Sequence, residues 1–376
     1  MCVNWYRLVT LEYLQGRGAE RCVRMHVWFA GQGPGVDRLF GTDERVYAFR
    51  ASKLCTLHMA MGSQTLAIDK TIKLEINGST QRIRLCGERA GLPPILIVQA
   101  GPGLPLLHEV AKFRRHLRLE SDFLVGYWEQ RGCGVASQED AKSVSLQRQV
   151  DDLRAVLRWL HDETKQALIV CGISLGAAIV LRAVGKEPDR VKSVVAISPD
   201  ADTAGSDAYA CAFLRERGAL AKNRRSSERV EKLGPPPYTD TTRFQLRGRL
   251  LADLGGIEHG KKFSAVLRET LFGMICTYGL VGTAKALRNM NLIQRQLLPE
   301  LVSLNLFADP PRLAVPVHYI FGEQDPLTPA SIVKQLPVAI VAPKHTVTLV
   351  PDAGHMVHFD KPDVVRSIAM SAREVG

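Results

Sequence analysis

From about residue 70 onward, apolar and polar residues follow the periods of strands and helices in turn. Residues 71–76 and 81–86 alternate apolar and polar positions, and Asn77-Gly78 between them is typical of a hairpin turn. Residues 94–99 are almost entirely apolar and predict a buried strand. A helix over about residues 106–118 and a strand over residues 122–128 are expected next.

The alternation continues through the middle of the chain. Residues 145–164 predict an amphipathic helix, whose apolar face carries Val150, Leu153, Val156, Leu157 and Leu160. Residues 166–171 predict a short buried strand and residues 178–184 a helix, and another strand is expected over residues 191–198. Strands that alternate with helices predict an α/β fold with a mostly parallel central sheet.

The strand pattern stops between about residues 200 and 312. Helices are expected there over residues 244–254, 262–278 and 281–289. We interpret this stretch as a helical cap inserted into the fold. The α/β pattern resumes with strands over residues 315–322 and 345–350, and a last helix is expected over residues 361–372.

These patterns divide the chain into three parts. Residues 66–200 and 313–376 form the α/β core, and residues 201–312 form the cap. Residues 1–65 show no clear periodicity and are treated as an extension of uncertain structure, whose first residues suit a short helix or a strand.

Composition limits the function classes. The 376 residues carry a net charge of +11, but no Lys/Arg block contains interleaved aromatic residues, so no nucleic-acid partner is expected. Eight scattered cysteines without a Cys-x-x-Cys pair predict reduced thiols in the cytoplasm, with no zinc site and no other metal or cofactor. No apolar run approaches the roughly 18 residues that span a bilayer, so no membrane partner is expected. The oligomeric state is left open.

The sequence Gly172-Ile173-Ser174-Leu175-Gly176 lies between the strand over residues 166–171 and the helix over residues 178–184. Gly-x-Ser-x-Gly at a strand-to-helix turn resembles the nucleophile elbow of the α/β-hydrolases. Gly172 and Gly176 would allow strand and helix to pass closely. Ser174 is the candidate nucleophile.

A serine hydroxyl needs a base, and the base needs an orienting acid. Two loops after predicted strands supply them in the expected chain order, with Asp325 as the acid and His355 as the base. Glu323 is an alternative acid and His358 an alternative base. Both loops follow strand ends that should lie at the same sheet edge.

An oxyanion hole requires backbone amides beside the nucleophile. Residues 99–103, Gln-Ala-Gly-Pro-Gly, follow the strand over residues 94–99 and fit this role. We therefore predict the amides of Gly101 and Leu175 as donors, with Gly103 as a supporting residue of the loop.

Four motifs together resemble the proline iminopeptidase-like branch of the α/β-hydrolases: the Gln-Ala-Gly-Pro-Gly loop, Glu129-Gln130-Arg131-Gly132, the elbow, and the loop of His355. The resemblance implies an α/β-hydrolase fold with a helical lid and a serine peptidase or related activity. It also implies that Gln130 and Arg131 support loops near the site. The cap of this chain differs because it contains no tryptophan and its acids lie among many arginines.

The leading hypothesis is a serine hydrolase that cleaves a small amide or ester through an acyl-enzyme, with a short peptide or other small molecule as substrate. The alternatives are a small-molecule carboxylesterase and a catalytically silent binding protein of the same fold. An aspartate at position 174 would indicate halide or epoxide chemistry, so the serine argues against it.

Overall fold

A computed structural model of the chain describes residues 4–15, 21–32, 67–220 and 224–374, with side chains within residues 67–217 and 228–374. The chain divides into two compact units, Met1–Ser63 and Gln64–Gly376. In the first unit, strands β1 (Asn4–Gln15) and β2 (Arg21–Gln32) pair as an antiparallel two-stranded sheet. The sequence left helix and strand open for the first residues, and the described part is a strand.

The second unit is built on an eight-stranded sheet with the order β10-β9-β8-β7-β5-β6-β4-β3. Its strands are β3 (Ile68–Ile76), β4 (Ser79–Gly87), β5 (Pro94–Val98), β6 (Leu124–Glu129), β7 (Leu168–Ile173), β8 (Val191–Ile197), β9 (Val317–Gly322) and β10 (His345–Val350). Strands β5 to β10 pair in parallel with one another. Strand β4 is antiparallel to β3 and to β6. The predicted fold class is therefore confirmed.

The β3–β4 hairpin forms where the sequence predicts it. Asn77 and Gly78 both have positive φ, at 47° and 75°. This left-handed backbone matches the twist of a two-residue hairpin turn and is tolerated best by asparagine and glycine. The turn fixes the register of the antiparallel edge of the sheet.

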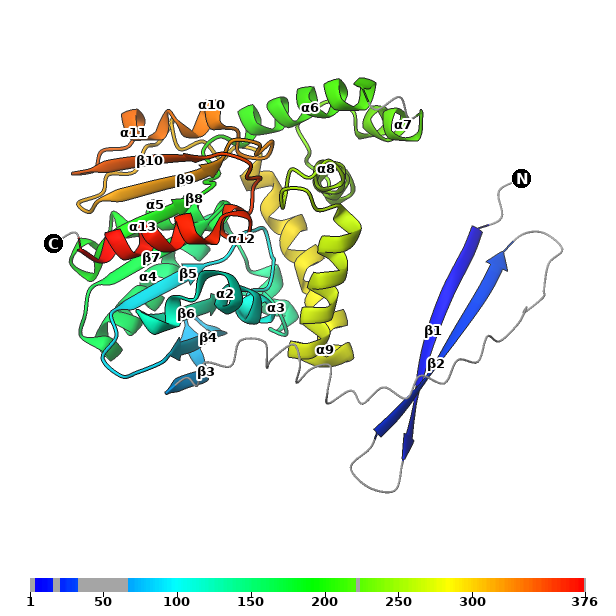
Figure 1. Ribbon diagram of the computed structural model, residues 1–376, viewed down its shortest axis with the longest axis horizontal. Helices are drawn as coiled ribbons and strands as arrows, with labels where there is room; N and C mark the ends of the chain where they lie inside the picture. The colour runs from blue at the N-terminus through cyan, green and yellow to red at the C-terminus, as the bar shows by residue number, and fades with distance from the viewer. Residues whose placement is uncertain (1–3, 16–20, 33–66, 221–223, 375–376) are drawn as a thin grey trace. The chain divides into compact units, whose positions relative to one another are not determined.

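Helices cover both faces of the sheet (Figure 1). They are η1 (Leu107–Glu109), α2 (Val110–Leu117), η2 (Leu119–Ser121), α3 (Gln138–Lys142), α4 (Leu146–Thr164), α5 (Leu175–Val184), η3 (Pro188–Arg190), α10 (Ala330–Val333), α11 (Leu336–Ala339), α12 (Val357–Asp360) and α13 (Pro362–Glu374). The helix predicted over residues 106–118 is thus divided into η1 and α2.

Two hydrophobic cores lie on opposite faces because successive strand residues point in opposite directions. In β7, Val170 packs in the core that contains the apolar faces of α4 and α5. Its neighbours Ile169 and Cys171 pack in the other core, with side chains of α2 and α13. β7 is therefore buried on both faces, which explains its continuous apolar sequence.

Four helices lie between β8 and β9: α6 (Thr203–Leu220), α7 (Arg224–Leu233), α8 (Thr241–Asp253) and α9 (Phe263–Leu301). Figure 1 shows them beside the sheet, and we call them the cap. α9 bends at Gly279, whose φ of 69° and ψ of 178° are not helical. Residues 263–278 and 280–301 thus form a first and a second arm, and the second extends beyond the predicted residues 281–289.

By length and composition alone, α9 is also the one helix of the described chain apolar enough to cross a membrane. No uninterrupted apolar run marks this helix in the sequence, because small and polar residues break the run. The bend at Gly279 divides the helix. The 39-residue helix is therefore not one continuous apolar rod.

Candidate active site

Ser174 occupies a sharp turn between β7 and α5. Its φ of 55° and ψ of −123° are sterically unfavourable for a residue with a side chain. A Cβ atom at Gly172 would lie 2.6 Å from Cα of Ala177, and one at Gly176 would lie 2.2 Å from the carbonyl oxygen of Gln99. Only glycine fits at both positions. The elbow is therefore strained at Ser174 and closely packed on either side.

Asp325 and His355 are in direct contact. His355 Nδ1 lies 2.8 Å from Asp325 Oδ2, and both side chains are buried. The other carboxylate oxygen, Oδ1, accepts the backbone N–H groups of Leu327 at 2.8 Å and Thr328 at 3.0 Å. The hydroxyl of Thr328 donates to Oδ2 at 2.5 Å. The carboxylate is therefore held in one orientation toward the imidazole.

The end of β8 joins the loops of Ser174 and His355. The Ser174 N–H donates to the carbonyl of Ile197 at 2.9 Å, and the next residue, Ser198, donates its hydroxyl to the carbonyl of His355 at 2.9 Å. Ser174 is 5% exposed and His355 is 6% exposed. Both residues therefore lie at one sheet edge beneath the surface.

The two alternative residues lie elsewhere. Glu323 is exposed, whereas Asp325 two residues later is buried against His355. His358 belongs to α12, and its ring stacks on Phe113 with centroids 5.1 Å apart. Burial and the nearby Lys112 hold the pKa of His358 well below its usual value. His358 thus packs in the core beside α2 as a neutral ring.

The predicted oxyanion loop lies against the elbow. Leu175 is the first residue of α5, so its N–H has no acceptor within the helix. A Cβ atom at Gly101 would lie 2.8 Å from Cδ2 of Leu175, and one at Gly103, which has φ of 75°, would lie 3.0 Å from Cβ of Ile293 in the second arm of α9. The two glycines let the elbow and the cap approach the loop from different sides.

Gln130 and Arg131 connect this region to the rest of the core. The Gln130 N–H approaches Gln99 Oε1 at 3.5 Å, and its side-chain oxygen accepts from Gln149 at 3.2 Å. Arg131 is buried and forms two hydrogen bonds to the carboxylate of Asp152 in α4, at 2.7 and 2.9 Å. It also donates to the carbonyl oxygens of the β3–β4 turn.

Glu129, which precedes them, binds the cap. Tyr278, the last residue of the first arm of α9, donates its hydroxyl to Glu129 Oε1. The same oxygen accepts the N–H of Leu107 at 3.4 Å. Burial raises the pKa of Glu129, although the bond from Tyr278 partly opposes this. The glutamate therefore links the bend of α9 to the segment after the oxyanion loop.

Another part of the cap holds the histidine loop directly. The N–H of His355 donates to the carbonyl of Gly256 at 3.0 Å, and the N–H of Met356 donates to that of Ile257 at 2.8 Å. The carboxylate of Asp360 accepts the N–H groups of His259 at 3.0 Å and Gly354 at 2.8 Å. No motif in the sequence marks Asp360, so these contacts could not be predicted from it.

The electrostatics around His355 involve one further carboxylate. Burial alone would lower the pKa of His355, but Asp325 and Asp200 outweigh it and the pKa is raised. Asp200 follows β8, and its N–H donates to the carbonyl of Ser174 at 3.3 Å. Burial raises the pKa of Asp200, opposed by His355 and Arg247. Sequence analysis did not single out Asp200, which has no motif around it.

Arg247 of α8 acts on both Asp200 and His355. It is buried and forms an ion pair with Asp207 of α6, and burial lowers its pKa to about 10. The carboxylates of Asp325 and Asp200 both favour the charged form of His355, and Arg247, which also pairs with Asp207, opposes them. The raised pKa of His355 shows that the carboxylates outweigh the arginine there.

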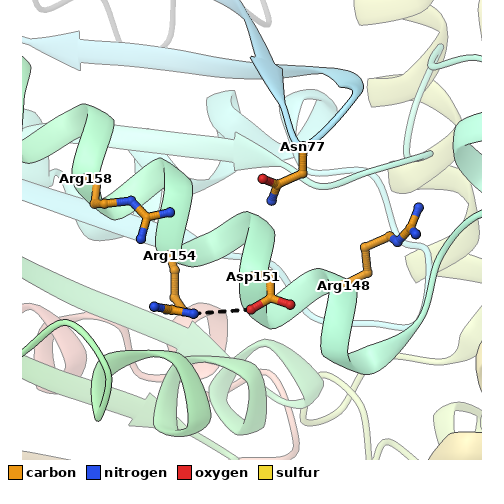
Figure 2. Close-up of a pocket in the computed structure, with 5 residues that line it drawn as sticks. All are labelled: Asn77, Arg148, Asp151, Arg154 and Arg158. Carbon is orange, nitrogen blue, oxygen red and sulfur yellow. Dashed lines mark hydrogen bonds and ion pairs between the residues drawn. The ribbon is translucent and has the colours of Figure 1, made fainter.

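A pocket lies away from these residues, along α4 (Figure 2). It has a volume of about 420 Å³ and is lined by Asn77, Arg148, Asp151, Arg154 and Arg158. Arg154 and Arg158 bind the buried carboxylate of Glu187 at 3.0 and 2.8 Å, and Arg154 also pairs with Asp151. Much of its positive charge is therefore neutralised within the protein.

No metal-binding cluster of His, Cys, Asp or Glu occurs among the described residues.

Comparison with known sequences places the chain among the hydrolases. Residues 102–368 match the family model described as "Alpha/beta hydrolase family". The chain is 27% identical over 307 residues to a "Probable aminopeptidase YbaC" of Bacillus subtilis (strain 168), covering 80% of this chain and 94% of that protein.

Solved structures share the fold. The crystal structure of VinJ superimposes with a TM-score of 0.61 at 17% identity, covering 83% of this chain and all 100% of that one. A proline iminopeptidase from Mycobacterium smegmatis gives a TM-score of 0.59 at 18% identity, covering 81% of this chain and 97% of that one. At these identities the similarity concerns the fold.

Proposed function

The chain belongs to the alpha/beta hydrolase family, and on that premise we propose that it is a serine hydrolase with Ser174, His355 and Asp325 as its catalytic triad. The observation that carries the proposal is the 2.8 Å contact between the buried Asp325 carboxylate and His355 Nδ1, at the sheet edge that also carries the strained Ser174. Strain of this kind is characteristic of catalytic positions.

In the proposed reaction, the Ser174 hydroxyl attacks the carbonyl carbon of an amide or ester. His355 accepts the hydroxyl proton through Nε2 and then donates it to the leaving amine or alcohol, which yields an acyl-enzyme. A water molecule loses its proton to His355 and attacks the acyl carbon. The acid is released and the proton returns to Ser174.

Asp325 and the backbone amides have separate roles in this scheme. Asp325 keeps the proton of the neutral imidazole on Nδ1 and stabilises the imidazolium that forms. The N–H groups of Leu175 and Gly101 would stabilise the negative oxygen of the tetrahedral intermediate. The Leu175 amide suits this role because it lies at the N-terminus of α5 without an acceptor inside the helix.

For the substrate, we propose an amide with a free amino terminus. The relative from Bacillus subtilis is a probable aminopeptidase, and it aligns over most of both chains. The local charge supports the same choice. Asp325 and Asp200 outweigh Arg247 in their effect on the pKa of His355, and Arg247 also pairs with Asp207. A protonated amine would be stabilised there.

The alternatives are distinguished by their chemistry. A carboxylesterase of the same fold would use the same triad but would not require the amino group. A catalytically silent binding protein would retain the fold without acyl transfer. The buried contact of Asp325 with His355 favours an enzyme, because an unused buried ionisable pair costs stability.

A substrate panel tests the proposal. Aminoacyl-naphthylamides, with proline included, are compared with their N-acetylated counterparts and with short p-nitrophenyl esters. We expect cleavage of the free-amine amides, a large loss of kcat/KM on acetylation, and a raised KM for these amides in Asp200→Asn with ester KM unchanged. Higher kcat/KM for the esters than for every aminoacyl amide would reject the aminopeptidase and favour the carboxylesterase.

A further inference from the structure

The first arm and bend of α9 expose several large apolar side chains. Leu267 and Ile275 lie two turns apart and are 39% and 41% exposed. Leu280 and Val281 follow at the bend and are 45% and 86% exposed. Isolated exposed apolar residues are ordinary. A series of them on one surface helix indicates an interaction surface for a protein or a membrane.

The opposite side of α9 is occupied by the core. A Cβ atom at Gly273 would lie 3.0 Å from the carbonyl oxygen of His108, and one at Gly282 would lie 3.1 Å from Cγ1 of Val135. Since Gly273 and Gly282 face the core, the exposed side chains face away from it.

Basic residues accompany this apolar surface. Arg268, Lys285 and Arg288 are exposed, and none of them forms an ion pair within the part of the chain that the structure describes. The nearby acid, Glu269, is already bound to Lys261 at 3.0 Å. Residues 201–312 contain 17 lysines and arginines against 11 acids, so the surrounding field is positive as well.

We propose that this face of α9 docks on the surface of an anionic lipid bilayer. Apolar side chains flanked by lysine and arginine are the combination that places a helix in the headgroup region, where the apolar groups enter the acyl boundary and the cations meet the lipid phosphates. The helix lies on the membrane and does not span it, because the bend at Gly279 interrupts it and the second arm packs in the core through Ile293 and Leu297. The sequence predicted no membrane partner because it lacks an uninterrupted apolar run, and the exposure of these residues depends on the tertiary fold.

This docking surface is independent of the proposed triad. It would place the cap, and with it the loops that hold His355, next to the membrane. A substrate with an acyl or other lipophilic group could then reach the site from the bilayer. Binding to vesicles can therefore be tested independently of whether Ser174 is a nucleophile.

Vesicle co-sedimentation of the full chain tests the proposal. Vesicles of phosphatidylcholine alone are compared with vesicles that also contain phosphatidylglycerol, at low and high salt. We expect binding to the anionic vesicles and a decrease with salt. Arg268→Glu should lower the partition coefficient about fivefold or more, since each cation near an anionic surface contributes about that factor.

Val281→Glu should also reduce binding. The matched control is Val338→Glu, because Val338 is 91% exposed but lies in α11. It should bind vesicles like the wild type. Equal binding by the two variants, or no binding of the wild type to either vesicle, overturns the proposal. The proposal is also overturned if light scattering shows a dimeric wild type and a monomeric Val281→Glu variant. That result would identify a second copy of the chain as the occupant of this surface.

Discussion

Replacement of Asp325 by asparagine is expected to abolish catalysis while the protein stays folded. Oδ1 of Asp325 accepts two backbone N–H groups, from Leu327 and Thr328. In the variant this position must keep the amide oxygen, because the amide NH₂ group cannot accept a hydrogen bond. The NH₂ group then faces His355 Nδ1. It donates to that nitrogen, so the ring proton moves to Nε2, which can no longer accept the proton of Ser174.

The magnitude follows from these contacts. Reversing the asparagine would place its NH₂ group against two backbone donors and leave them unsatisfied, at about 1–3 kcal/mol each. The inactive orientation is therefore favoured. A wrong tautomer in a triad lowers kcat about 10⁴-fold, which corresponds to about 5.4 kcal/mol of transition-state stabilisation. Stability should change little, because the hydroxyl of Thr328 can rotate to accept from the new NH₂ group.

The assay is kcat on the best substrate of the panel, with circular dichroism to establish folding. Glu323→Gln is the matched control, since Glu323 is exposed in the same loop and should retain wild-type activity. A folded Asp325→Asn protein with less than a tenfold loss of kcat would refute the reasoning. If Glu323→Gln is the inactive variant instead, the acid has been assigned to the wrong residue.

Three further predictions concern packing, the buried ion pair and pH. Gly176→Ala should unfold at a lower temperature and lose activity, since its Cβ would lie 2.2 Å from the carbonyl oxygen of Gln99; wild-type melting and activity would contradict this. Arg131→Met should lose about 3–5 kcal/mol in urea unfolding because Asp152 stays buried without its cation, and Arg131→Met with Asp152→Leu should recover part of the loss. A double variant no more stable than the single one would argue against the pair. The raised pKa of His355 means that the base becomes protonated at higher pH than usual, so kcat/KM should fall on acidification with a midpoint above 6.5, and a midpoint below 6.5 would be inconsistent with it.

Local sequence patterns predicted those parts of the molecule that depend on local physics. Asn77-Gly78 predicted its hairpin because a two-residue turn needs positive φ at both positions. The glycines at 172 and 176 predicted the elbow because a sharp strand-to-helix turn has no room for side chains. The chain order after Ser174 limited the acid to Asp325 or Glu323 and the base to His355 or His358, and the preferred pair, Asp325 and His355, is in contact.

Features that depend on packing between distant segments could not be predicted in this way. The contact of Gly256 with His355 joins a cap loop to a core loop, and no short motif encodes it. The sequence showed that the acids of the cap lie among many arginines, but it could not show that Arg247 pairs with Asp207 or that Asp200 acts on His355. Likewise, the apolar residues of α9 are compatible with a buried helix or an exposed one. Only the fold shows that Val281 is exposed.

Covalent labelling by a fluorophosphonate tests the central claim that Ser174 is an activated nucleophile. The probe is added to the wild type and to Ser174→Ala, and the labelled residue is located by peptide mass spectrometry. We expect one adduct on the wild type, at Ser174, and none on the folded variant. A folded wild-type protein that remains unlabelled, or a label on another residue that persists in Ser174→Ala, would contradict the account.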